Sequence, residues 1–353
     1  MIFNNNTLTH LDIDLGNKCN LRCLACERWL DPNPIEFPKD VLWKKLEEVM
    51  GYVEDNCKNF DKLMIIGGEP FVHEGLAEFL SQQSYCIYTI IYTNFAVPLE
   101  KYQWPRNIHF ITSWDAPDDK TYRQIRRTKD FPIVMRNISL NKDKIIHVDT
   151  TVSKLNILKL DHILEMTEEI GCTHWFFPID PRVLRYAKHH PENKLAQITA
   201  SKLMKIVLDF SDLEVVKKFF ERHQDNNRIN EYSMFEGIYL AGFRHFQDIP
   251  EYSKKIKINE INIPFDIKHC PAVEHYLEIT FDRFGKFIPI LHCPILREKH
   301  PDERLPRFNN FGELIEWIST IRSQIKCKSF CGRTQFLGLD VYKDTFSEMK
   351  KDE

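Results

Sequence analysis

The sequence lacks an apolar run long enough to cross a membrane. None of its hydrophobic stretches approaches the ~20 residues that a helix needs to span a bilayer. The first seven residues contain no basic stretch followed by an apolar one, so no secretory signal is evident. These absences predict a cytoplasmic protein without a membrane partner, in a compartment where thiols stay reduced.

An excess of charge of either sign is also missing. The 353 residues carry 48 basic and 51 acidic side chains, a formal net charge of −3. Because binding to nucleic-acid phosphates usually requires a basic field, no nucleic-acid partner is expected. We find no long internal repeat and no low-complexity segment. The length fits two domains, or one large α/β domain with an appendage.

Cysteine, in contrast, is plentiful, with ten residues. In a reducing compartment this number favours metal or cluster ligation over disulfides. The question is therefore which cysteines are spaced as ligands, and on which elements they lie.

The first half of the chain alternates short apolar runs with helical patterns. The predicted strands are 11–15, 63–66, 86–92, 108–113, 145–152 and 173–178. The predicted helices between them are 40–53, 74–83, 118–126 and 159–170. Strand and helix recur about every 25 to 35 residues, which is typical of βαβ units and a parallel sheet. About six strands favour an α/β fold with an open, partial (β/α)6 TIM-like barrel over a closed eightfold one.

The second half has a different pattern. We expect a barrel core at 1–180, a helical connector or insertion at 181–263, a small C-terminal α+β domain at 264–344 and a frayed tail at 345–353. The expected elements outside the core are helices 200–210 and 213–222, a hairpin of 276–281 with 286–290, and helix 314–325.

Three cysteines, Cys19, Cys23 and Cys26, follow the first predicted strand within eight residues. Three thiolates can hold three irons of a cubane 4Fe–4S cluster and leave the fourth iron open for chemistry. The carboxyl end of a parallel strand is where barrel enzymes place their chemistry. The alternatives are a zinc knuckle or three unrelated core cysteines, but a structural zinc site would normally have a fourth Cys or His nearby.

The pattern Cys-x-x-x-Cys-x-x-Cys, together with Gly67-Gly68-Glu69-Pro70 at the end of the second strand, resembles the radical S-adenosylmethionine (SAM) superfamily. The resemblance covers roughly residues 9–180. It implies that SAM binds the open iron, and that one electron from the cluster yields a 5′-deoxyadenosyl radical, which abstracts hydrogen from a substrate. The glycine pair would let the backbone approach SAM closely, with its carbonyls facing the ammonium group.

Further matches follow the later strands. Asn94, Ser113, Arg126 and Thr151 resemble positions that contact the ribose and the methionine carboxylate in relatives, with turn capping as the alternative. Phe95 stands where the family has a glycine after the asparagine.

Another departure concerns adenine. The residue before the third cysteine is usually aromatic in the family, but here it is Ala25. Trp29 or Phe71 is then expected to pack near the adenine instead.

A second set of cysteines, Cys270, Cys293, Cys327 and Cys331, resembles the twitch domain, a shortened SPASM domain. The resemblance implies an auxiliary 4Fe–4S cluster with four protein ligands. Three residues separate the last two cysteines where the family usually has two, and a four-cysteine zinc site is the alternative.

The three remaining cysteines stand apart from both sets. Cys86 and Cys172 lie beside predicted strands and are expected to be buried packing residues, while Cys57 follows the first helix.

The resemblance implies a radical SAM oxidoreductase that takes electrons from a flavodoxin- or ferredoxin-type reductant. The auxiliary cluster favours a net oxidation of a small polar metabolite, such as a sugar or nucleotide. The alternatives are peptide modification (a thioether, a C–C crosslink or epimerisation) and, more remotely, a non-catalytic iron–sulfur or zinc protein. No peptide-binding module is expected ahead of the first strand.

Candidates for accepting the substrate proton are Asp115, Asp149, Asp180 and Tyr186.

Overall fold

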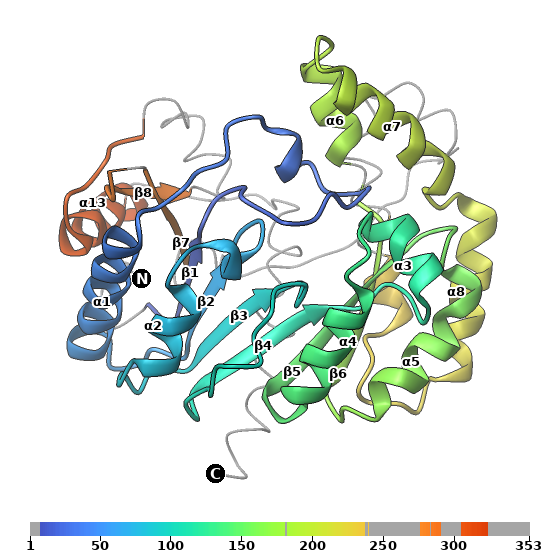
Figure 1. Cartoon of the computed structure of the whole chain (residues 1–353), viewed down its shortest axis with the longest axis horizontal. Helices are drawn as coiled ribbons and strands as arrows, with labels where there is room; N and C mark the ends of the chain where they lie inside the picture. Colours follow the sequence, from blue (N-terminus) through green and yellow to red (C-terminus); the bar gives the residue numbers. More distant parts are fainter. Residues whose placement is uncertain are drawn as a thin grey trace.

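The computed structural model describes residues 8–180, 182–236, 239, 276–282, 284–290 and 305–323. Its centre is one sheet of eight strands in the order β6-β5-β4-β3-β2-β1-β7-β8 (Figure 1). The strands are β1 (His10–Asp14), β2 (Lys62–Ile66), β3 (Thr89–Thr93), β4 (Ile108–Ser113), β5 (Ile145–Val152), β6 (Thr173–Pro178), β7 (Tyr276–Phe281) and β8 (Phe287–Ile290).

Strands β1 to β6 are all parallel and neighbour one another in chain order. The connecting helices are α1 (Lys39–Asn56), α2 (Leu76–Gln82), α3 (Asp119–Arg126), α4 (Phe131–Leu140) and α5 (Leu160–Glu168). Helix α1 buries Leu42, Leu46, Val49, Met50 and Val53, the spacing of one helical face, against the sheet. The predicted α/β architecture with a parallel sheet is therefore confirmed.

The predicted boundaries of three strands match the structure, whereas other elements differ. Strands β4, β5 and β6 have the predicted bounds. Strand β3 begins at Thr89 rather than at residue 86. Helix α4 was not predicted, although Pro132 lies in its first turn, where a missing N–H is tolerated.

After β6 the chain forms helices α6 (Arg182–His189), α7 (Lys194–Ile206) and α8 (Phe210–Arg222). The prediction of a helix at 200–210 was wrong at both ends. Asn193 starts α7 earlier, because its side chain accepts a hydrogen bond from Ala196 N at 3.0 Å. Asp209 is extended and caps α8, so it separates the two helices.

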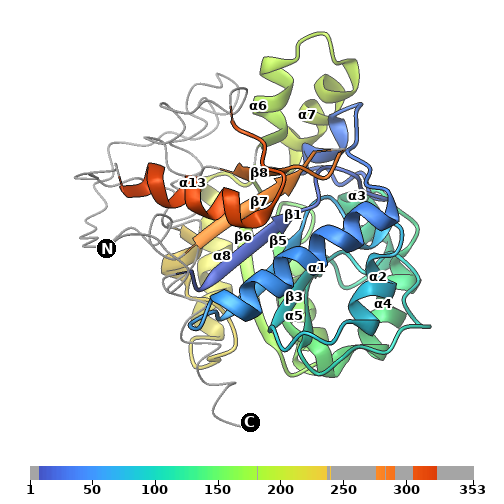
Figure 2. The same ribbon diagram turned by 90° about the vertical axis from the view of Figure 1, so that its left-hand side faces the viewer.

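The hairpin of β7 and β8 does not stand apart from the core sheet. Its strands are antiparallel, as predicted, and β7 pairs in parallel with β1. The rings of Phe281 and Phe287 lie 5.3 Å apart, and Phe311 of α13 (Phe311–Ser323) lies 5.7 Å from Phe287. Phe311 N donates to Glu48 of α1 at 2.7 Å. Figure 2 shows α13 beside β7, β8 and α1.

Cys270, Cys293, Cys327 and Cys331 lie outside the described residues, as do the tail and most of the segment before β7. The auxiliary cluster and the proposed domain limits therefore stay predictions. Every helix in the described part of the chain is too short or too polar to serve as a membrane span.

The face of the sheet away from the helices carries both apolar and polar side chains. Met64, Ile90 and Ile111 form a small apolar cluster there, distinct from the core under the helices. Because side chains alternate along a strand, Tyr92 lies on the same face as Ile90. Strand pairing places His147 beside Ile111, so His147 and, by alternation, Asp149 and Thr151 lie on this face too, here called the inward face.

Candidate active site at the carboxyl ends of the strands

The segment of residues 15–30, here called the cysteine loop, leaves β1 at its carboxyl end and contacts two neighbouring elements. Gly68 N donates to Gly16 O at 2.7 Å, and Glu69 N donates to Lys18 O at 2.9 Å. Leu24 N donates to Ile125 O at the end of α3, at 3.0 Å. The loop is thus held between the ends of β2 and α3.

The two glycines after β2 are required by the approach of this loop. A Cβ on Gly68 would lie 2.2 Å from Lys18 O, and Gly67 has a φ of 149°. No donor among the described residues reaches the carbonyl oxygen of Gly67 or Gly68. The glycine pair therefore serves loop packing and leaves two acceptors for a ligand.

Glu69 ties the end of β2 to the end of β3. Its buried carboxylate accepts hydrogen bonds from Phe71 N at 3.1 Å, Thr93 Oγ1 at 2.8 Å and Asn94 N at 2.7 Å. Burial raises the pKa of Glu69 to about 7, although the three hydrogen bonds oppose the shift. Glu69 thus fixes the strand ends, while Pro70 begins the short 3-10 helix Pro70–Val72.

The three thiols of the cysteine loop are partly buried, and those of Cys19 and Cys23 accept hydrogen bonds from N–H donors. Cys19 Sγ accepts from Leu21 N at 3.3 Å and from Asn94 Nδ2 at 3.8 Å, and Cys23 Sγ accepts from Arg126 Nη1 at 3.7 Å. Burial raises the pKa of Cys19 to about 12 and of Cys23 to about 11, and it raises the pKa of Cys26 as well. Cationic iron would offset this cost of ionising three thiols together.

A cluster and a single metal ion place different demands on the positions of the three cysteines. Among the described residues, no three His, Cys, Asp or Glu side chains converge on one ion. In a cubane each thiolate binds its own iron, so convergence on one point is not needed.

Asn94 lies at the cysteine loop, and its predicted contact with SAM stays a prediction. Its Nδ2 donates to Asn20 Oδ1 at 2.9 Å as well as to Cys19 Sγ. The next residue, Phe95, has a φ of 53°, the left-handed region that explains the family's glycine at this position. The ring of Phe95 is fully buried against Phe110, which offsets the backbone cost.

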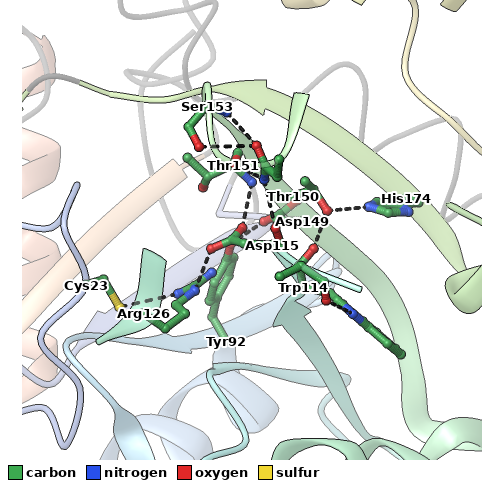
Figure 3. A network of polar contacts seen from close by, with 12 residues as sticks. Cys23, Tyr92, Trp114, Asp115, Arg126, Asp149, Thr150, Thr151, Ser153 and His174 are labelled. Atoms are coloured by element: carbon green, nitrogen blue, oxygen red, sulfur yellow. Dashed lines mark hydrogen bonds and ion pairs between the residues drawn. The ribbon is translucent and has the colours of Figure 1, made fainter. Parts of the chain in front are cut away.

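Arg126 connects the cysteine loop to the ends of β4 and β5 (Figure 3). Its Nε lies 2.6 Å from Asp115 Oδ2, while its Nη1 faces Cys23 Sγ. Asp115 Oδ1 accepts from Thr151 N at 2.8 Å. The structure therefore brings Arg126 and Thr151 together through Asp115. Ser113, nine per cent exposed, ends β4 and pairs with Asp149 of β5.

The predicted proton acceptors differ in their surroundings. Asp115 is paired with Arg126, and Asp180 lies 2.7 Å from Arg182 Nε. Tyr186 Oη donates to Leu30 O at 3.2 Å, which holds α6 against the cysteine loop. Each of these three groups thus has a partner among the described residues, and its role as a proton acceptor stays a prediction.

Asp149 has partners that the sequence analysis missed. The Tyr92 hydroxyl donates to its Oδ2 (Figure 3). His147 Nε2 lies 2.8 Å from its Oδ1. His147 Nδ1 in turn lies 2.6 Å from Thr173 Oγ1. The available signal was the alternation of His147, Asp149 and Thr151 along one strand face. A Tyr–Asp–His set thus lies on the inward face of β3 and β5.

The two cysteine predictions can be judged directly, and the two aromatic candidates differ in burial. Phe71 packs in the core, 5.6 Å from the Trp104 ring and 6.2 Å from the Phe110 ring, whereas Trp29 is half-buried at the cysteine loop. The prediction that Cys86 is buried was wrong, because it precedes β3 and is exposed. Cys172 is buried as predicted.

Comparison with known proteins yields no matching family model. The chain is 24% identical to a GTP 3′,8-cyclase of Petrotoga mobilis over 172 residues, which are 46% of this chain and 52% of that protein. It is 23% identical to a GTP 3′,8-cyclase of Clostridium perfringens over 211 residues, 57% of this chain and 62% of that protein. The chain thus spans between half and two thirds of these relatives.

Among solved structures, Streptococcus suis SuiB bound to its precursor peptide SuiA matches with a TM-score of 0.53 and 17% identity, covering 94% of this chain and 71% of that chain. SuiB bound to S-adenosylmethionine matches with a TM-score of 0.50 and 16% identity, covering 94% and 70%. The chain shares the fold of SuiB. Sequence and fold together support the radical SAM superfamily.

Proposed function

We propose that this protein is a radical SAM enzyme. The observation that carries the proposal is the cysteine triplet, with N–H donors on the sulfurs of Cys19 and Cys23. Its loop is hydrogen-bonded to the segment of Gly67 and Gly68, whose carbonyl oxygens meet no donor among the described residues. When bound, the cluster and SAM would supply a 5′-deoxyadenosyl radical through one-electron cleavage of SAM. The likeness to GTP 3′,8-cyclases and to SAM-bound SuiB supports this proposal.

The chain's own residues would bind and orient these groups. Cys19, Cys23 and Cys26 would hold three irons, and the carbonyls of Gly67 and Gly68 would accept hydrogen bonds from the SAM ammonium. Asn94, Ser113, Arg126 and Thr151 surround the same edge of the sheet and would contact the ribose and the carboxylate.

A small polar metabolite is the substrate class that we propose. The cyclase relatives act on a nucleotide by name, and the inward sheet face carries the Tyr92–Asp149–His147 set. In a net oxidation the substrate loses a hydrogen atom to the radical, then one electron to the proposed auxiliary cluster and one proton to a base. Asp149, reached through Tyr92, is the base that we propose.

A peptide substrate is the second candidate. It is favoured by the shared fold with SuiB, whose structure contains a precursor peptide. The remaining alternative, a non-catalytic iron–sulfur or zinc protein, predicts no SAM cleavage at all.

The test is anaerobic reconstitution with iron and sulfide, reduction with dithionite and an assay for 5′-deoxyadenosine and methionine. We expect both products from the wild-type protein. We expect them also from Cys57→Ala, which changes a buried cysteine at the C-terminal end of α1 that is not a proposed ligand. Cys23→Ala should give neither product. Equal cleavage by Cys23→Ala and the wild type would refute the assignment.

A further inference from the structure

Two exposed arginines flank one aromatic ring on the surface of the cysteine loop. The guanidinium carbon of Arg22 lies 5.8 Å from the centroid of the Trp29 ring, and that of Arg127 lies 5.3 Å from it. Such cation–π contacts contribute about 0.5–1 kcal/mol each at exposed sites. We call Arg22, Trp29 and Arg127 the arginine–tryptophan patch.

The patch is bonded directly to the backbone of two cluster cysteines. Trp29 Nε1 donates to Cys23 O at 2.9 Å, and Arg22 Nη1 donates to Cys19 O at 2.8 Å. An electron path from the Trp29 ring to the Cys23 backbone, or from the Arg22 guanidinium to the Cys19 backbone, therefore crosses a single hydrogen bond. This short connection suits electron transfer into the cluster.

The charge of the patch is not neutralised locally. Within the described ranges, no carboxylate pairs with Arg22 or Arg127, whereas Arg123 on the same helix lies 2.6 Å from Asp119. The whole chain has a net charge of −3, so an acidic protein would be repelled by its average surface. A local cationic patch would steer such a partner to the cysteine loop.

The backbone of Arg127 supports a dedicated role. The residue follows α3 with a φ of 57°, a position that glycine usually occupies. An arginine there costs roughly 1–2 kcal/mol relative to the right-handed conformation. The arginine places a guanidinium over the Trp29 ring in spite of this backbone cost. A glycine at the same position would provide no side chain over the ring.

We propose that the arginine–tryptophan patch is the docking surface for a small acidic one-electron carrier protein of the flavodoxin or ferredoxin class. The inference rests on the proposed radical SAM function. In each encounter the reduced carrier loses one electron and the oxidised cluster gains it, with no bond made or broken and no proton required. Arg22 and Arg127 attract the carrier, and Trp29 lies between it and Cys23.

The experiment compares two reductants on the same cluster-loaded proteins. SAM cleavage by wild type, Arg22→Gln, Arg127→Gln and Arg127→Gly is measured with dithionite and with a flavodoxin kept reduced by NADPH and its reductase. With flavodoxin at low salt we expect each variant to be about tenfold slower, a difference that shrinks as salt screens the charges. With dithionite, all rates should equal the wild-type rate. Arg123→Gln, which loses a paired arginine, should match the wild type with both reductants.

The outcomes separate this inference from the proposed function. Unchanged flavodoxin-driven rates in the variants would overturn the docking surface while leaving the enzyme assignment intact. An equal loss with dithionite and flavodoxin would also overturn it, because the patch would then act on cluster assembly. If cluster-loaded wild-type protein cleaved no SAM even with dithionite, the function itself would fall, and the docking proposal with it.

Discussion

Arg126 and Arg127 are adjacent in sequence but face different surroundings. Arg126 is directed into the site, between Asp115 and Cys23, whereas Arg127 is exposed over Trp29. The turn out of α3 at Arg127, with its positive φ, separates the two side chains. The sequence motif predicted that Arg126 belongs to the site, but not that its guanidinium reaches a cysteine sulfur, because that contact depends on how the loop folds back.

Arg126 should tune the potential of the first cluster. A cation that donates to a ligand sulfur stabilises the more negative, reduced cluster. Arg126→Gln should therefore lower the midpoint potential by on the order of 60 mV, equivalent to about a tenfold change for one electron. An EPR-monitored redox titration measures this. Arg127→Gln should leave the potential unchanged, and an equal shift in both variants would contradict the assignment.

Gly68 and Gly51 give a matched pair of glycine substitutions. A Cβ on Gly68 would meet the Lys18 backbone at 2.2 Å, whereas one on Gly51, inside α1, would meet only the Tyr85 hydroxyl at 3.8 Å. Gly68→Ala should lower the free energy of unfolding by about 1–3 kcal/mol and reduce iron retention. Gly51→Ala should raise it by roughly 0.5–1 kcal/mol. Denaturant unfolding checks both, and a neutral Gly68→Ala would refute the close-approach argument.

At the scale of elements, β6 carries a buried histidine with a consequence for stability. His174 has hydrogen-bonding distances of 2.8 Å to Thr150 Oγ1 and 2.7 Å to Thr167 Oγ1. Burial, and then the nearby His147, lowers the pKa of His174 well below 6.5. The folded state therefore keeps the ring neutral while the unfolded chain takes up a proton.

The contribution of neutral His174 to the free energy of unfolding is therefore fully present above pH 6.5 and is lost as the pH falls below that value. The loss is at most about 1.4 kcal/mol per pH unit. His174→Gln should give a protein whose melting temperature falls less steeply between pH 6.5 and 5.5 than that of the wild type, both carrying the same cluster. Parallel pH profiles would show that His174 is not the titrating group.

The elements also show which features a local pattern can predict. Strands β4 to β6 follow from their β-branched and aromatic residues, and the antiparallel hairpin follows from its Asp282–Gly285 turn. The limits of α7 did not follow, because Asn193 and Asp209 override the apolar spacing with side-chain caps. Strand β3 begins only at Thr89, and Cys86 N donates to the Glu54 side chain at 2.8 Å instead of to a neighbouring strand.

At the scale of the whole molecule, the pairing of β7 with β1 is the feature that no local pattern could predict. Residues 276–281 are far from residues 10–14 in sequence, and a one-residue change in register would exchange the two faces of the strand. The pairing of β7 with β1 places the side chains of Leu277 and Ile279 in the hydrophobic core that also contains the buried face of α1. The Tyr92–Asp149–His147 set was missed for the same reason, since it joins β3 to β5.

Iron content tests the second set of cysteines. If Cys270, Cys293, Cys327 and Cys331 bind an auxiliary cubane, the reconstituted protein should contain about eight irons, four for each cluster. Cys327→Ala should then contain about four, keep SAM cleavage and lose the product of the coupled oxidation. About four irons and one zinc in the wild type would contradict the auxiliary cluster.

The most direct test of the central claim asks whether SAM binds the cluster iron that lacks a protein ligand. Electron–nuclear double resonance of the reduced protein, with SAM labelled at its amino nitrogen and carboxylate oxygen, measures that contact. We predict hyperfine coupling from both labelled atoms, and its loss in Cys23→Ala. A reduced-cluster spectrum that does not respond to SAM would contradict the account.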